Sequence, residues 1–203
     1  MDLASIYKEA GALLEGHFLL ASGKHSPYYL QSAKVLESPA QAMRLAQALA
    51  TKIRVAGIEA DTVCAPAIGG LIAGFALAQA MDLRSIFVEK ENGTMVLRRG
   101  FSVKEGERVI ICEDIITTGG SARKAADALR KLGAKPVAYA ALANRGICKR
   151  YDNENGSAKA ECKLETDIPL FALGDFYFET YEPEACPLCK AGAGEAIKPG
   201  SRG

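Results

Sequence analysis

The sequence lacks an excess of charge of either sign. Its 203 residues include 25 Lys and Arg against 24 Asp and Glu, which gives a formal net charge of +1. A protein that binds nucleic acid or an anionic membrane through its overall charge carries a clear basic excess. We therefore expect neither nucleic acid nor a membrane among the partners of this chain.

Long apolar runs are also missing. Gly, Pro or a charged residue interrupts every apolar stretch before it reaches the roughly 18 residues that a transmembrane helix needs. Residues 1–16 contain acidic side chains and lack the basic-then-apolar order of a secretory signal peptide. Six cysteines are too few for a secreted disulfide scaffold of this length. Together these absences predict a cytoplasmic protein.

Internal repeats and low-complexity tracts are not visible, so repeat architectures are excluded. What is present is an ordinary globular composition, with 49% apolar and 24% charged residues. The length fits one domain, or one domain with an appendage.

From residue 38 onward, apolar runs alternate with helical patterns. Ser38, Pro39 and Gln41 form a helix start with a capping box, and Gly57 ends that helix. We predict helices at 3–14, 38–55, 70–80 and 121–132, extended segments at 18–20 and 28–35, and strands at 62–65, 85–89, 108–112, 137–142 and 168–173. This order predicts an α/β fold with a central, mainly parallel sheet flanked by helices. Ligands bind such sheets at the carboxyl ends of the strands.

The strongest functional signal is the segment VIICEDIITTGGSA at residues 109–122. A buried strand leads to Glu113 and Asp114, and then to a small, hydroxyl-rich turn that opens a helix. Such a turn offers backbone N–H groups and hydroxyls to a phosphate at the positive end of the helix dipole. The two carboxylates suit sugar hydroxyls or a cation beside that phosphate. The alternative is an ordinary turn with Ser121 as the N-cap, but paired acids at the end of a buried strand are costly without a ligand.

Two common phosphate motifs do not fit this segment, because no Lys follows Gly120 and the glycines at 69–74 lack dinucleotide-binding spacing. The segment instead resembles the phosphoribosyl pyrophosphate signature of the type I phosphoribosyltransferases. The resemblance implies that Glu113 and Asp114 hold the ribose hydroxyls. It also implies that the rest of the loop binds the donor's 5-phosphate, through Ile115, Ile116, Thr117, Thr118, Gly119, Gly120 and Ser121.

Further segments, between about residues 15 and 145, resemble the orotate phosphoribosyltransferases within that family. Residues 22–29 are similar to the hood that covers bound orotate, and Tyr29 and Leu30 would lie against the pyrimidine. An ordinary hairpin with aromatic core residues is the alternative. Arg145 follows a predicted strand and matches the family's orotate-binding arginine, with Thr117 as the second orotate contact. A guanidinium binds a carboxylate bidentately, and purines lack that carboxylate.

Two loops complete the resemblance and show where the chain departs from it. Residues 65–70 resemble the pyrophosphate loop, whose small residues permit an unusual peptide geometry. Residues 89–100 stand where the family has a mobile lid. There Lys90 matches a basic lid residue of the family. The resemblance implies that Lys90 and Asp114 are the catalytic residues. The resemblance implies a catalytic lysine near position 94, where Thr94 or Gly93 stands here. Some relatives also have phosphate-binding lysines at the positions of Ala21 and Gly69. Arg98 and Arg99 either compensate for these losses or form a solvated charge pair.

The resemblance implies a small N-terminal hood at residues 1–36, a phosphoribosyltransferase core at 37–180 and a tail at 181–203. The implied reaction joins ribose 5-phosphate to orotate, yielding orotidine 5-monophosphate in UMP synthesis. Mg²⁺ would be bound mainly through the substrate, with no direct protein ligand. The resemblance also implies a homodimer that shares the lid across its interface. The alternatives are a transferase for another base, or a nucleic-acid-binding regulator that senses the donor.

The tail contains a CxxC motif, Cys186 and Cys189. With Cys148 and Cys162 it would complete a four-thiolate zinc site. Because Cys148 and Cys162 are widely spaced, we expect free thiols instead.

Overall fold

The computed structural model describes residues 2–20 and 22–199, which form two compact units. The first unit comprises residues 36–176. The second combines residues 2–35 with the chain from Tyr177 onward. Ala21, which the sequence analysis compares with a lysine of some relatives, lies outside the described residues.

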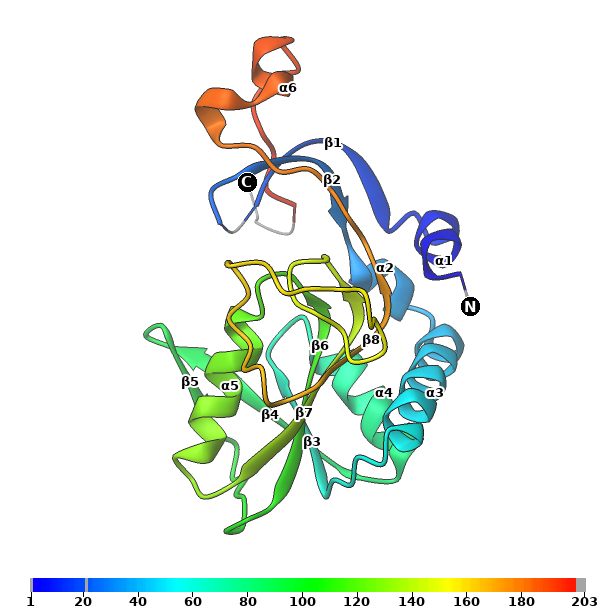
Figure 1. Ribbon diagram of the computed structural model, residues 1–203, viewed down its shortest axis with the longest axis vertical. Coiled ribbons are helices and arrows are strands. Elements are labelled where there is room, and N and C mark those ends of the chain that lie inside the picture. Colours follow the sequence, from blue (N-terminus) through cyan, green and yellow to red (C-terminus); the bar gives the residue numbers. More distant parts are fainter. Residues whose placement is uncertain (1, 21, 200–203) are drawn as a thin grey trace. The chain divides into compact units, whose positions relative to one another are not determined.

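The first unit is built on a six-stranded sheet (Figure 1). Its order is β5-β4-β3-β6-β7-β8, and every neighbouring pair is parallel except β4 and β5. The strands are β3 (Thr62–Pro66), β4 (Arg84–Glu91), β5 (Thr94–Leu97), β6 (Arg108–Ile116), β7 (Lys135–Asn144) and β8 (Leu170–Asp175). The predicted α/β fold with a mainly parallel sheet is confirmed.

Helices cover both faces of this sheet. Helices α3 (Pro39–Val55) and α4 (Leu71–Met81) pack on one face, and α5 (Gly120–Arg130) packs on the other (Figure 1). The predicted start of α3 is confirmed, because the Ser38 hydroxyl accepts a hydrogen bond from the Gln41 backbone N–H at 3.4 Å. As a result the central strand β6 is apolar on both sides, and residues 109–112 are fully buried.

The second unit contains α1 (Leu3–Glu9), the antiparallel hairpin of β1 (Leu13–Leu19) and β2 (His25–Leu30), and α2 (Ser32–Leu36), which runs to the edge of the unit. The predicted helix at 3–14 is too long. It ends at Glu9 because Gly11 has a positive φ of 60° and the chain then enters β1. The extended segment at 28–35 is half wrong, since its second part is α2.

The tail is more ordered than its sequence suggests. It forms a short 3-10 helix, η1 (Pro183–Ala185), and α6 (Pro187–Lys190). His25 and Tyr181 exchange two backbone hydrogen bonds at 2.8 and 2.9 Å, so the tail is attached to β2 within the second unit.

The structure corrects the expectation of free thiols at two positions. Cys148 and Cys162 form a disulfide in the first unit, so neither joins the CxxC motif in a four-thiolate site. Cys64, Cys112, Cys186 and Cys189 are free. Within residues 2–20 and 22–199, no helix combines the length and the apolar character that crossing a membrane requires.

Candidate active site

The two acids stand at the carboxyl end of β6, where the strand is longer than predicted. Pairing with β7 continues through Glu113, which lies opposite Ala141, to Ile116, which lies opposite Asn144. The chain therefore holds both carboxylates in the sheet itself. Glu113 is buried and Asp114 is half-buried. Burial, and then the negative charge of Asp114, raises the pKa of Glu113 to about 8.

The donor loop, residues 117–121, connects β6 to α5. Thr117 and Ser121 are exposed, and α5 begins at Gly120, so the first amides of the helix face the loop. The N-cap is Gly119 rather than Ser121, and it has a φ of +76°, a conformation that favours glycine. The predicted alternative in which Ser121 caps the helix is therefore wrong, and its hydroxyl is available at the surface.

A segment beyond β7, which is not among the predicted site residues, supports the donor loop. The Lys163 backbone N–H donates to the Thr118 carbonyl at 2.8 Å. A Cβ on Gly119 would lie only 2.4 Å from the Leu164 side chain, so the two segments are in close contact. The disulfide at Cys162 holds the same segment to Cys148. No local pattern in the sequence indicates this pairing.

The predicted pyrophosphate loop, residues 65–70, lies against the two acids. A Cβ on Gly70 would lie 2.8 Å from the Cys112 carbonyl and 3.2 Å from Glu113 Oε2. A Cβ on Gly69 would lie 3.1 Å from Asp114 Oδ1. Glycine at 69 thus allows the loop to approach Asp114 closely. The unusual geometry that the small residues permit is present as a cis peptide bond between Ala67 and Ile68.

Arg145 lies one residue beyond β7, next to the end of β6. Its backbone N–H donates to the Ile116 carbonyl at 2.8 Å, and Thr117 directly follows Ile116. The two predicted orotate contacts are therefore brought together by the register of β6 and β7. Arg145 is buried, and burial lowers its pKa to about 10. A buried guanidinium favours the binding of an anion such as a carboxylate.

The predicted lid segment contains an antiparallel hairpin. Lys90 on β4 lies opposite Met95 on β5, and the turn at Asn92 and Gly93 has positive φ at both residues. Lys90 and Thr94 are exposed. Arg98 and Arg99 are both exposed, as a solvated charge pair would be, and each also forms an ion pair.

These ion pairs join the ends of the lid segment. Arg99 binds Glu89 through two hydrogen bonds at 2.8 and 2.9 Å, and Arg98 binds Glu91 at 2.7 Å. With Lys90 these four side chains line an open cavity of about 380 Å³. The lining of this cavity therefore contains both acidic and basic side chains, and two arginines and a lysine lie beside the end of β4.

The remaining predicted orotate contacts belong to the second unit. Tyr29 and Leu30 are on β2, where they lie opposite Leu14 and Leu13 of β1. The Tyr29 ring packs beside Phe18 with the ring centres 5.8 Å apart, and Leu30 is buried. This packing within the hairpin corresponds to the alternative that the sequence left open, and it is compatible with either role.

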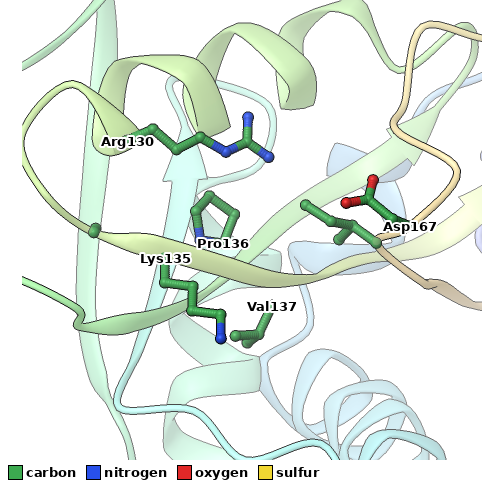
Figure 2. Close-up of a pocket in the computed structure, with 7 residues that line it drawn as sticks. Arg130, Lys135, Pro136, Val137 and Asp167 are labelled. Atoms are coloured by element: carbon green, nitrogen blue, oxygen red, sulfur yellow. The ribbon is translucent and has the colours of Figure 1, made fainter.

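A second pocket lies near the amino end of β7, away from the carboxyl ends where the site residues lie (Figure 2). Its volume is about 420 Å³, and its charged lining residues are Arg130, Lys135 and Asp167, around the amino end of β7. Parallel strands carry their functional loops at the carboxyl ends. None of the predicted site residues among those described lines this pocket, and we assign it no role in the site.

This site defines a phosphoribosyltransferase, because the fold brings the two acids, the donor loop and the predicted pyrophosphate loop together at the carboxyl ends of the strands. Residues 31–168 match the family model described as "Phosphoribosyl transferase domain". Two relatives named orotate phosphoribosyltransferase, from Sulfurovum sp. (strain NBC37-1) and Sulfurimonas denitrificans, are 64% and 63% identical over 203 residues, covering 100% of both chains in each case. The chain therefore belongs to the orotate phosphoribosyltransferase family, whose members are pentosyltransferases.

The structural comparison agrees on the fold. The crystal structure of orotate phosphoribosyltransferase from Aeropyrum pernix superposes with a TM-score of 0.64 at 24% identity, covering 95% of this chain and 99% of that one. At that identity the likeness supports the architecture alone.

Proposed function

We propose that this chain transfers ribose 5-phosphate from 5-phosphoribosyl 1-pyrophosphate to N1 of orotate, giving orotidine 5-monophosphate and pyrophosphate in UMP synthesis. The observation that carries the proposal is the convergence of Glu113, Asp114, the donor loop and Arg145 at the carboxyl ends of β6 and β7. An acidic pair for ribose, an amide-rich turn for phosphate and a buried guanidinium for a carboxylate match the three charged or polar parts of the two substrates.

The donor is held by β6 and the loop that follows it. Glu113 and Asp114 accept hydrogen bonds from the ribose hydroxyls, and residues 115–121 bind the 5-phosphate through backbone amides and the hydroxyls of Thr117, Thr118 and Ser121. Hydrogen bonds to a carboxylate favour its charged form. Burial raises the pKa of Glu113 to about 8 in the free protein, and hydrogen bonds from the ribose hydroxyls favour its ionised form when the donor binds.

Orotate is held by its carboxylate and its ring. Arg145 binds the carboxylate, and Thr117 makes a second polar contact. For the ring contacts, the family resemblance implies Tyr29 and Leu30. The burial of Arg145 supports this role, because a desolvated guanidinium discriminates strongly against a base that lacks an anion.

Catalysis in this proposal stabilises a positive sugar and a negative leaving group. Breaking the bond to pyrophosphate leaves an oxocarbenium-like ribose, which the carboxylate of Asp114 stabilises. Lys90 neutralises charge on the diphosphate, with Arg98 and Arg99 nearby in sequence and already paired with acids. Because Gly69 has no side chain, the charge of the diphosphate is neutralised by lid residues and by backbone amides. Lid closure excludes the water that would hydrolyse the donor.

Mg²⁺ fits this site as a substrate-bound ion. The ion would be held mainly by the diphosphate and ribose hydroxyls of the donor, and the Glu113 and Asp114 carboxylates beside the ribose are oxygen groups of the kind that Mg²⁺ prefers. When bound, Mg²⁺ supplies charge neutralisation on the diphosphate. We further propose a cytoplasmic homodimer in which each lid completes the partner's site, as the family resemblance implies.

Orotate depletion, followed by ultraviolet absorbance, tests the reaction. The protein is incubated with orotate and the donor, with and without Mg²⁺, and separately with adenine or uracil in place of orotate. We expect orotate loss that requires both donor and metal, and no loss of the other bases. Turnover of adenine or uracil, but not orotate, would establish another base as the acceptor. Donor binding without turnover of any base, together with salt-dependent binding to nucleic acid, would establish the regulator instead.

A further inference from the structure

The second unit gathers two histidines and two cysteines that the reaction does not use. His17 lies on β1 and His25 on β2, whereas Cys186 is the N-cap of α6 and Cys189 lies within that helix. One nitrogen or sulfur atom from each of the four lies within 4.8 Å of those of the other three. The sequence shows the CxxC motif, but its histidine partners stand more than 160 residues away and come from a different part of the chain.

The distances between these atoms match a tetrahedral metal site. His17 Nε2 lies 3.6 Å from the sulfur of Cys186 and 3.6 Å from that of Cys189, and His25 Nδ1 lies 3.4 Å from the sulfur of Cys189. Bond lengths of about 2.3 Å to sulfur and about 2.0–2.1 Å to nitrogen place tetrahedral S and N ligands about 3.5 Å apart. The two ring nitrogens are 2.8 Å apart, so they separate by a few tenths of an ångström when both bind one ion.

The other nitrogen of His17 fixes which ring atom is available. His17 Nδ1 lies 2.8 Å from the Gly194 carbonyl, and a carbonyl only accepts hydrogen bonds. Nδ1 therefore carries the proton, and Nε2 presents its lone pair to the cysteines. A backbone carbonyl that orients a histidine in this way is the usual outer partner of a metal-binding imidazole.

The backbone holds the four residues in place from both sides. His17 accepts a hydrogen bond at its carbonyl from the Ile197 N–H at 2.8 Å, and the Leu19 N–H donates to the Ile197 carbonyl at 2.8 Å. His25 exchanges two hydrogen bonds with Tyr181. The hairpin is thus bonded to the tail on either side of α6. His17, His25 and Cys186 are buried, whereas Cys189 is exposed.

We propose that His17 Nε2, His25 Nδ1, Cys186 Sγ and Cys189 Sγ bind one zinc ion. Two thiolates and two imidazoles in tetrahedral order select Zn²⁺ over Mg²⁺, which prefers oxygen ligands. All four positions are filled by the protein, so the ion is structural and has no open position for substrate. Binding deprotonates both thiols and releases those protons to solvent.

The role of the ion is to stabilise the second unit. This unit contains only about 60 residues, a size at which a hydrophobic core alone gives marginal stability. Its buried apolar side chains among the described residues are Leu3, Tyr7, Ala12, Phe18, Leu30, Val35 and Cys186. A metal that joins the hairpin to the tail provides the missing constraint.

Metal analysis of untagged protein, purified without chelator and under reducing conditions, tests the proposal. We expect about one zinc per chain. Protein reconstituted with Co²⁺ should show the intense visible absorption of tetrahedral cobalt and a thiolate-to-cobalt charge-transfer band. These two readouts do not depend on catalytic turnover, so they remain informative even if the proposed reaction is absent.

Two variants complete the test. Cys189→Ser changes the exposed ligand and should lose most of the zinc and the thiolate band. Cys64→Ala changes a buried cysteine in the core of the first unit and should keep both. Wild-type protein without zinc that also fails to give the cobalt spectrum would overturn the proposal. Zinc retained in full by Cys189→Ser and by His17→Ala would also overturn it. If Cys189→Ser proves insoluble, the wild-type cobalt spectrum still decides.

Discussion

At the residue scale, Glu113 stands out because it is an acid whose burial is unfavourable until a ligand binds. Its folded pKa of about 8 exceeds the unfolded value of 4.5 because of burial and then the charge of Asp114. The stability linked to its protonated form is fully present below pH 4.5 and is lost as the pH rises through 8. Ionised Glu113 is thus unfavourable in the unliganded site, and hydrogen bonds from substrate hydroxyls reduce this unfavourable free energy.

Glu113→Gln should therefore stabilise the unliganded protein at high pH. The amide cannot ionise, so we expect a gain of about 2–4 kcal/mol in unfolding free energy at pH 8 and about none near pH 4.5. Urea unfolding at several pH values measures the difference. Donor binding should weaken in the same variant, because an amide is a poorer acceptor than a carboxylate.

Glu107 provides a matched control, because its pKa is shifted in the opposite direction to that of Glu113. Although burial opposes it, hydrogen bonds from Thr62 and from the Lys104 backbone lower the pKa of this buried carboxyl. Its stability contribution is present above pH 4.5 and is lost as the pH falls through its folded pKa. Glu107→Gln should thus destabilise at pH 8. Equal effects of the two substitutions at pH 8 would contradict the environment assigned to Glu113.

In our proposal Arg145 makes the enzyme selective for orotate, because it binds the carboxylate of that base. Arg145→Lys should weaken orotate binding by about 1.5–3 kcal/mol, or about 10- to 150-fold, because a lysine cannot form the bidentate pair. Donor affinity should be unchanged, and calorimetry measures both. Arg150→Lys is the control, since Arg150 pairs with Asp152 and Asp175 and should affect stability alone. Normal orotate affinity in Arg145→Lys would remove Arg145 from the site.

At the element scale, the register between β6 and β7 places most of the site. The sequence predicts β6 only to residue 112, because the apolar run ends there and the acids look like loop residues. Hydrogen bonds to β7 continue the strand to Ile116, and a single sequence does not reveal such pairing. The β4–β5 hairpin is different. Its Asn92–Gly93 turn is a recognisable hairpin signal, although β5 is absent from the strands predicted from the sequence.

The donor loop depends on a close contact with the segment that follows the disulfide. Gly119→Ala places a Cβ in the left-handed region and into Leu164. We expect a loss of about 2–4 kcal/mol, the sum of a backbone term of about 1–2 and an overpacking term of similar size. Gly106 has a similar φ of +73° with nothing within 4 Å of its Cβ position. Gly106→Ala should therefore show the backbone term alone, and equal losses in urea unfolding would contradict the Leu164 contact.

At the scale of the whole molecule, local pattern predicts the layers of the first unit well and the second unit poorly. The alternation of apolar runs from residue 62 onward specifies strands and helices because each burial pattern is local. The second unit instead depends on contacts between residues 13–30 and the tail, and on side chains from both ends of the chain. The pairing of Cys148 with Cys162 and the position of the two histidines beside the CxxC motif are of the same non-local kind.

If a metal stabilises the second unit, removing it should loosen that unit and spare the sheet. Hydrogen exchange of the wild-type protein, with and without a strong zinc chelator, measures this by segment. We expect faster exchange at the amides of Leu19, His25, Tyr181 and Ile197, which bond the hairpin to the tail. The amides of β6 and β7 should keep their protection, because their bonds belong to the sheet of the first unit. Adding Zn²⁺ back should restore slow exchange, whereas adding Mg²⁺ should not. Loss of protection in β6 to the same extent would mean that the two units unfold as one, and unchanged exchange at His25 and Tyr181 would mean that the metal does not stabilise this region.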